Sequence, residues 1–243
     1  MRARGFMAVF FPMLCFWIGI VAKDGSNHEV DTSEHGRWTE SFSLEECDFS
    51  PTGRNAYFIL EPGYQLHLEG IEEGDTVKLT ITVLNEKERI GNVETRVVEE
   101  KETVNGKVIE VSRNFFALCT QTSSLFYFGE DVDIYEGGEV VSHGGAWRAD
   151  SGEAKAGVMM PGIILLGARY YQEIAPGVAM DRAEIMSCDE TLETPAGMFE
   201  NCLEIEETTP LEPENREYKV YAPGIGLIKD GALLLTKYGF TDR

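Results

Sequence analysis

Apolar and polar residues alternate with a period of two along most of the chain from Trp38 onward. Between Thr76 and Leu84, four aliphatic residues at every second position from Val77 to Val83 are separated by threonine and lysine. This pattern predicts a strand with one buried face and one solvated face. No stretch of ten or more residues after Trp38 keeps a helical period of 3.6. The sequence therefore predicts a strand-rich fold with little helix.

A long hairpin is predicted where two β-rich stretches, Val93–Val104 and Lys107–Leu118, flank Asn105-Gly106. This dipeptide favours a type I′ turn, because both central residues of that turn need positive φ. Phe115 and Phe116 are expected to mark the buried base of the hairpin. The charged residues near the tip are expected to project into solvent; they are Glu99, Glu100, Lys101, Glu102 and Lys107.

Further short strand patterns follow, with one interruption between residues 144 and 182. That stretch is apolar and punctuated by glycine and proline, which indicates a long loop or lid, or a loop that caps the open end of the sheet. The predicted fold is all-β: a single antiparallel meander that forms a barrel-like or half-barrel sheet over residues 37–243. The later strands are expected at 125–128, 132–135, 139–143, 183–188, 202–208, 216–221, 226–229 and 233–238.

The N-terminus has the pattern of a secretory signal peptide. Arg2 and Arg4 precede an apolar run from Phe6 to Val21, and Ala22 offers a small residue for cleavage. We expect a signal peptide at 1–22, a flexible linker at 23–36, and export to the periplasm or beyond the cell. Retention of the segment as an anchor stays open, although the run is shorter than the roughly 20 residues of a spanning helix. After cleavage no stable membrane span is expected.

The chain is strongly acidic. It has 21 Lys and Arg against 42 Asp and Glu, for a net charge of -21. Nucleic acid and anionic membranes are poor partners for such a chain, because phosphate binding needs a concentrated basic face.

Four cysteines remain after the predicted cleavage: Cys47, Cys119, Cys188 and Cys202. An even number in an exported chain predicts two disulfides. A hairpin turning at Pro195-Ala196-Gly197 would bring Cys188 close to Cys202, so the favoured pairing is Cys188–Cys202 with Cys47–Cys119. Buried free thiols are the alternative.

Two segments resemble exported bacterial domains of the TapB-like family. They are Thr194–Leu203, which reads TPAGMFENCL, and Tyr221–Lys229, which reads YAPGIGLIK. In such families the first segment is a turn between two strands and the second leads into the last hairpin of an antiparallel, barrel-like sheet. The resemblance implies fold and export, and it implies no activity.

Aromatic residues are the first candidates for a binding site. Together with the apolar 159–166 loop they would line a concave sheet that accepts an amphiphilic ligand. A core filled by the same side chains is the alternative. The candidates are Phe115, Phe126, Phe128, Trp147, Tyr170 and Tyr171.

Carboxylates supply two further candidates. Glu130, Asp131 and Asp133 lie in an apparent loop after an aromatic strand and offer the oxygen ligands that Ca²⁺ prefers. Glu173 and Asp181 flank the Ala175-Pro176-Gly177 turn, and such a pair can serve general acid–base chemistry on a glycoside.

The sequence thus favours an exported binding or scaffold domain without enzymatic activity or a required cofactor. Its expected partner is a small amphiphilic ligand or another protein of the envelope or extracellular space. A Ca²⁺-stabilised structural domain and a carbohydrate-active enzyme are the alternatives. A symmetric homo-oligomer through an exposed sheet edge fits the strand count without being required by it.

Overall fold

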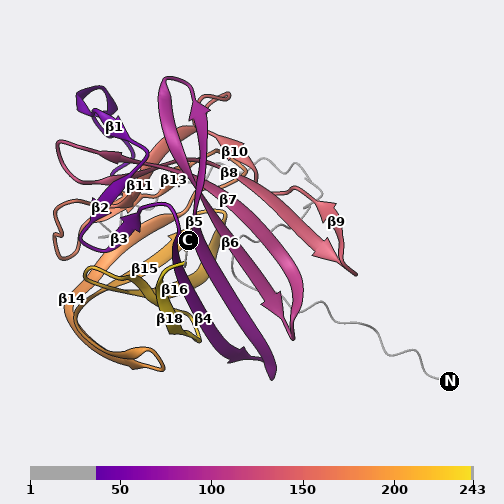
Figure 1. Ribbon diagram of the computed structural model, residues 1–243. Coiled ribbons are helices and arrows are strands. Elements are labelled where there is room, and N and C mark those ends of the chain that lie inside the picture. Colours follow the sequence, from indigo (N-terminus) through magenta and orange to yellow (C-terminus); the bar gives the residue numbers. More distant parts are fainter. Residues whose placement is uncertain (1–36, 242–243) are drawn as a thin grey trace. The chain divides into compact units, whose positions relative to one another are not determined.

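The computed structural model describes residues 37–241, and the predicted signal peptide and linker lie outside this range. The chain is nearly all strand, at 68%, in one antiparallel sheet that curls into a nearly closed barrel with an unsealed seam (Figure 1). The predicted all-β fold is therefore confirmed. Within residues 37–241 the one helix is a single 3₁₀ turn, and no helix is long and apolar enough to cross a membrane.

The elements follow one another with short connections. They are η1 (Leu44–Glu46), β1 (Phe49–Ser50), β2 (Gly53–Asn55), β3 (Phe58–Leu60), β4 (Tyr64–Glu72), β5 (Asp75–Ile90), β6 (Val93–Val104), β7 (Lys107–Cys119), β8 (Leu125–Glu136), β9 (Glu139–Ser142), β10 (Trp147–Arg148), β11 (Lys155–Met160), β12 (Arg169–Tyr171), β13 (Glu173–Ile174), β14 (Arg182–Thr194), β15 (Gly197–Thr209), β16 (Glu212–Ala222), β17 (Gly226–Asp230) and β18 (Leu233–Phe240).

The predicted hairpin forms as β6 and β7, and its turn has the expected geometry. Asn105 and Gly106 have φ of 50° and 78°, the left-handed region that a type I′ turn requires. The hairpin at Pro195-Ala196 also forms, between β14 and β15. The interrupted stretch 144–182 is less irregular than expected, because β10 to β13 run through it and leave the segment 161–168 as a loop.

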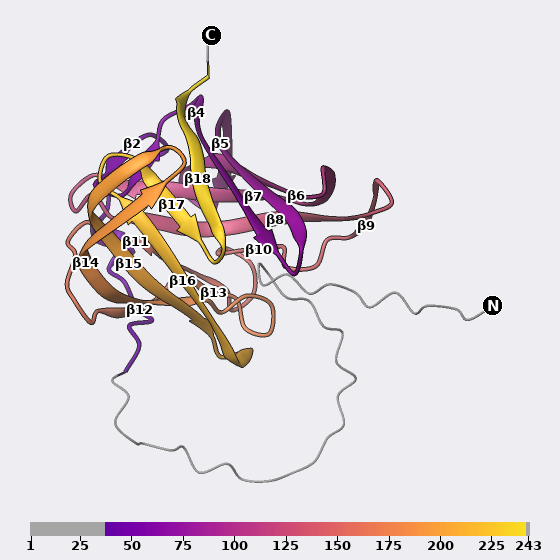
Figure 2. The ribbon, with the colours of Figure 1, turned by 90° about the horizontal axis from the view of Figure 1, so that it is seen from below.

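A single segment of chain crosses the unsealed seam of the barrel. The strand order runs from β12 through β14–β18 and β4–β8 to β11 and β13, so the two edge strands β12 and β13 are consecutive along the chain. Residues 169–171 pair with β14 on one wall, and residues 173–174 pair with β11 on the other. Figure 2 shows the two walls, β4–β8 and β14–β18, curving around a common interior.

Because neighbouring strands are antiparallel, each connection between strands lies at one of the two ends of the barrel. The turns at 73–74, 105–106, 137–138, 210–211 and 231–232 share one end with the 175–181 connection, and we call this the upper end. The connections at 61–63, 91–92, 120–124, 161–168, 195–196 and 223–225 form the lower end. Because side chains alternate across a sheet, the registers then identify which residues face inward at each end.

The lower part of the interior is a packed apolar core. Leu66 and Leu68 of β4 face Ile81 and Leu79 of β5, and all four are buried. Other fully buried side chains complete this core: Leu60, Leu125, Met160, Ile185, Leu203, Ile205, Ile228 and Leu235. Burial of this apolar surface is the main driving force for closing the sheet.

One disulfide forms and the other predicted one does not. Cys47 and Cys119 are bonded, with their Cα atoms 5.1 Å apart, and they tie the segment after η1 to the end of β7. Such a bond is typical of proteins that fold in an oxidising compartment. Cys188 and Cys202 are free thiols, the first exposed and the second buried. In the β14–β15 register the partner of Cys202 is Glu190 and not Cys188, which explains why the predicted pair does not form.

The prediction for the charged part of β6 and β7 was wrong at two positions. Glu100 lies opposite Ile81 and Glu102 lies opposite Leu79, so both glutamates occupy the inward face of β6. Glu99 and Lys101 occupy the outer face. The hairpin is thus part of the barrel wall, and its inward charges belong to the interior.

Candidate functional site

Carboxyl groups line the upper part of the barrel interior. The registers place Glu102 opposite Glu110 and Glu207 opposite Glu217, each pair on the inward face next to an upper turn. Lys219 lies on the same face, opposite Asp230. Glu173 and Asp181 lie close to these acids, because, in addition to burial, Glu130 raises the pKa of Glu173 and Glu207 raises that of Asp181. The acids of this region, here called the acidic interior, are Glu72, Glu100, Glu102, Glu110, Glu130, Glu173, Asp181, Glu207, Glu217 and Asp230.

Lys219 is the electrostatic centre of this group. Its Nζ lies 2.7 Å from Glu207 Oε2 and 4.0 Å from Asp230 Oδ2, and all three side chains are nearly buried. Burial alone would lower the pKa of Lys219, but Asp230 and Glu207 raise it well above its usual value. Lys219 therefore stays charged and offsets the negative charge of its neighbours.

Burial holds several of these carboxyl groups in their neutral form. Desolvation raises the pKa of Glu100 and Glu102 to about 7, and that of Glu110 and Glu217 to about 8. Neighbouring acids such as Asp230 raise these values further, because like charges disfavour ionisation. Near neutral pH these four carboxyl groups are therefore partly protonated.

These pKa values predict that the protein loses stability as the pH rises from about 5 to about 8. In this window the folded chain holds protons that the unfolded chain, with its ordinary pKa of 4.5, has already released. Stability falls with pH wherever the folded state binds more protons. Urea unfolding at pH 5, 6.5 and 8 measures the slope.

Two single-charge variants separate this effect from the overall negative charge. Glu110→Gln removes a partly buried titrating group with a raised pKa, and we expect it to flatten the decline in stability. Glu139→Gln removes the same charge from an exposed position in β9 and should leave the slope unchanged. Stability that is constant or rises over this window would contradict the raised pKa values.

Glu130 is the most isolated acid of the interior. Its side chain is 1% exposed, and neither carboxyl oxygen has a partner in good hydrogen-bond geometry, although Ser112 lies near enough to lower its pKa. Desolvation raises its pKa well above the usual range, and Glu110 and Glu100 raise it further. A buried polar group without a partner lowers the stability of the fold by about 1–3 kcal/mol. A polar group that formed a hydrogen bond with Glu130 would remove this cost.

Two aromatic side chains bring unpartnered polar atoms to the same interior. Trp147 lies opposite Glu130 in the β8–β10 pair, and its buried Nε1 has no partner in good hydrogen-bond geometry, although it lies near enough to Glu173 to lower the pKa of that acid. Tyr170, on β12, has a buried hydroxyl without a partner, and Glu207 is near enough to raise its pKa. The ring of Tyr127 packs edge-on against Trp147, with ring centroids 5.2 Å apart. The acids thus face an aromatic wall.

The structure brings the two predicted acids Glu173 and Asp181 together. The backbone of Glu173 donates to the carbonyl oxygen of Asp181 at 3.3 Å, and their side chains are within hydrogen-bonding reach of each other. Desolvation and this mutual repulsion raise the pKa of Glu173 well above its usual value. One proton shared between the two groups satisfies this arrangement.

The six candidate aromatic residues do not share one surface. Trp147 and Tyr170 face the interior, whereas Phe115, Phe126 and Phe128 lie on the outer face. There the Arg148 guanidinium stacks on Phe115 at 4.2 Å, and Phe49 packs against both Phe126 and Phe128. Tyr171 also faces outward, with its ring centroid 6.4 Å from that of Trp38.

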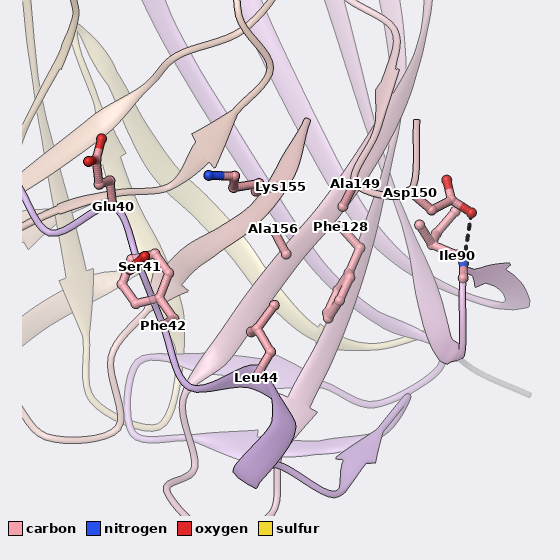
Figure 3. Close-up of a pocket in the computed structure, with 11 residues that line it drawn as sticks. Glu40, Ser41, Phe42, Leu44, Ile90, Phe128, Ala149, Asp150, Lys155 and Ala156 are labelled. Carbon is pink, nitrogen blue, oxygen red and sulfur yellow. Dashed lines mark hydrogen bonds between the residues drawn. The ribbon is translucent and has the colours of Figure 1, made fainter. Parts of the chain in front are cut away.

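Phe128 lines a separate pocket of about 300 Å³ on the outside of the barrel (Figure 3). Phe42 and Leu44 of the N-terminal segment form one side of this pocket, and Lys155 lies at its border. The backbone N–H of Gly91 donates to Asp150 Oδ2 at 2.8 Å at one edge. The pocket contains no unpartnered buried polar atom, so we consider the interior the stronger site.

The three candidate Ca²⁺ ligands lie in strand β8 and not in a loop. Glu130 faces inward, while Asp131 faces outward and pairs with Arg148 at 2.8 Å. Asp133 is held by Arg113 and by His143 Nδ1, 3.3 and 2.9 Å away. Across the described residues no group of three or more His, Cys, Asp or Glu side chains is arranged to hold a metal ion.

The chain was compared with protein-family models, with curated proteins and with solved structures, and none of the three comparisons found a match.

Proposed function

We propose that this chain is an exported binding domain whose ligand is a small amphiphilic amine, held in the acidic interior without covalent chemistry. The observation that carries the proposal is the buried, unpartnered carboxyl group of Glu130 beside the unpartnered Nε1 of Trp147. These three atoms, the two Glu130 oxygens and Trp147 Nε1, lack a partner in good hydrogen-bond geometry in the folded chain, and a bound ligand with polar groups would satisfy them.

The charge of the interior favours a cation. Lys219 neutralises only part of the negative charge when the surrounding carboxyl groups ionise. An ammonium group placed between Glu130 and its acidic neighbours would stabilise their ionised forms, which burial otherwise disfavours. Charge-assisted hydrogen bonds of this kind are about twice as strong as neutral ones.

The aromatic wall favours an apolar portion attached to that cation. Tyr127 and Trp147 present ring surface next to Glu130, and Tyr127 also contacts Phe116, with ring centroids 4.7 Å apart. Aromatic faces attract cations and cover apolar groups, so an amine with an aromatic or short alkyl part matches both surfaces.

The paired acids favour binding over glycoside hydrolysis. The carboxyl groups of Glu173 and Asp181 are within hydrogen-bonding reach. Glycosidases of either stereochemical class separate their two carboxyl groups by about 5 Å or more. When a cationic ligand binds, the proton shared by Glu173 and Asp181 can leave, and the ligand then takes its place as the positive charge between the two carboxylates.

Isothermal titration calorimetry with phenethylamine, and with the uncharged 2-phenylethanol, tests the proposal. We expect the amine to bind and the alcohol to bind at least about tenfold more weakly, because only the amine forms an ion pair. Binding should release protons, since carboxyl groups with raised pKa must ionise; measurements in two buffers of different ionisation enthalpy detect this release.

A matched pair of variants identifies the site. Glu130→Gln should abolish amine binding, whereas Asp131→Asn removes the same charge one residue along, on the outer face of β8, and should leave it intact. Equal affinity for the amine and the alcohol, or equal loss in both variants, would refute the proposal. Ca²⁺ binding that depends on Asp131 would instead favour the metal-stabilised alternative.

A further inference from the structure

The loop between β11 and β12, residues 161–168, carries three large aliphatic side chains in solvent. Ile163, Leu165 and Leu166 are 74%, 63% and 68% exposed. Single exposed apolar residues are common on protein surfaces, but three in one short loop at the tip of a barrel form a contiguous apolar patch. We call these three residues the apolar tip.

The loop is held in place at both ends. The backbone N–H of Gly162 donates to Ser124 Oγ at 3.0 Å, and Asn55 Nδ2 donates to the carbonyl oxygen of Pro161 at 3.0 Å. At the other end, the Gly167 N–H donates to the carbonyl oxygen of Ile185 at 2.8 Å. The backbone also packs closely, because a Cβ at Gly162 would collide with the backbone of Thr122. The chain thus fixes the loop while leaving the apolar tip uncovered.

The charge around the apolar tip differs from that of the rest of the chain. From Ala156 to Gln172 there is no Asp or Glu, and Arg169 is the one charged residue, in a chain with a net charge of -21. A pocket of about 510 Å³ borders the loop, lined by the exposed Arg37, by Phe42 and by Arg169, which is half-buried and paired with Glu184 at 2.8 and 3.1 Å in the same pocket. Nearby, Trp38 lies under the guanidinium of Arg182 at 4.5 Å. Aromatic and cationic side chains at the edge of an apolar tip are typical of surfaces that sit at the lipid headgroup level.

We propose that the apolar tip docks the lower end of the barrel onto the surface of a lipid bilayer. A protruding loop with three aliphatic side chains is small for a stable protein interface, which buries about 800 Å² on each partner. Insertion into the acyl region needs only burial of apolar side chains, with no complementary shape. The absence of acids along the loop avoids both repulsion from lipid phosphates and burial of negative charge in the bilayer.

Co-sedimentation of the exported protein with phosphatidylcholine vesicles tests this proposal. We expect the wild-type chain to bind, and Ile163→Ser/Leu165→Ser/Leu166→Ser to bind about tenfold or more weakly. The control is Ile71→Ser/Val140→Ser/Val141→Ser, which removes three other exposed aliphatic side chains at the upper end and should bind like the wild type. All variants carry the same N-terminal segment ahead of residue 37, so differences between them report on the mutated positions.

Three outcomes would overturn the proposal: a wild-type chain that does not bind vesicles, equal binding by the tip variant, or equal loss in the control. A wild-type chain that ignores vesicles but self-associates, with a monomeric tip variant, would assign the apolar tip to contact between copies of this chain. Amine binding in the acidic interior is measured without vesicles, so either proposal can fail without the other.

Discussion

Replacement of Lys219 by methionine is expected to destabilise the protein by about 3–5 kcal/mol at pH 7.5. The substitution leaves Glu207 and Asp230 buried without their cation, and removal of one partner from a buried ion pair has a cost of this order. At pH 5 the loss should be smaller, because more of the surrounding carboxyl groups are protonated. Urea unfolding of the wild type and the variant at pH 5 and pH 7.5 measures the two differences in free energy of unfolding.

Two further variants make the Lys219 prediction specific. Lys78→Met removes a half-exposed lysine that pairs with Glu69 at 2.8 Å, and a surface pair of this kind is worth less than about 1 kcal/mol. Adding Glu207→Gln to Lys219→Met should recover much of the lost stability, since it removes the carboxylate that lay closest to the lysine. A Lys219→Met variant no less stable than Lys78→Met would mean that water screens the interior as effectively as it screens the surface.

Loss of the Cys47–Cys119 disulfide is expected to cost about 4 kcal/mol. The bond closes a loop with a sequence separation of 72 residues, and the chain-entropy model gives this magnitude for a loop of that length. The variant to measure is Cys47→Ala/Cys119→Ala, by its urea midpoint under oxidising conditions. Reductant should shift the wild-type midpoint toward that of the variant and should leave the variant itself unchanged.

Cys188→Ala is the matched control for the disulfide, because Cys188 is an exposed free thiol. Its free energy of unfolding should equal that of the wild type within about 0.5 kcal/mol. If removal of the Cys47–Cys119 bond has no greater effect than this, the segment from η1 to β1 contributes little to the barrel. Its packing of Phe49 against Phe126 and Phe128 would then be incidental to stability.

The fold was predictable because its signals are local. Alternation in β5 and the Asn105-Gly106 turn each specify structure within a few residues, and both predictions are confirmed. The pairing of Cys188 was wrong because it depends on register across the hairpin. Irregularities in the β14–β15 ladder shift that register, and the sequence gives no clear sign of them.

The acidic interior was missed for a different reason. In β6, Val98, Glu100, Glu102 and Val104 share one face, so the period-2 rule already placed the two glutamates on the same face as the buried Val98. Taken alone, a charged hairpin is expected to have a solvated tip. The face of β6 that carries Glu100 and Glu102 turns toward the interior only when the whole sheet curls into a barrel. The closeness of Glu173 to Asp181 was visible in sequence, whereas Lys219 could not be singled out, because its partners come from β15 and β17.

The crossing of the chain between β12 and β13 gives the barrel one weak junction. β12 pairs with β14 through three residues and β13 pairs with β11 through two, and within residues 37–241 no ladder joins β12 to β13. Along the strand order, the other ladder of two pairs, β17–β18, lies inside the sheet between β16 and β4. Local opening has the lowest free energy where the fewest ladder pairs must separate. Breathing of the barrel should therefore concentrate at residues 169–174, beside Glu173, so that solutes can reach the buried carboxyl groups without global unfolding.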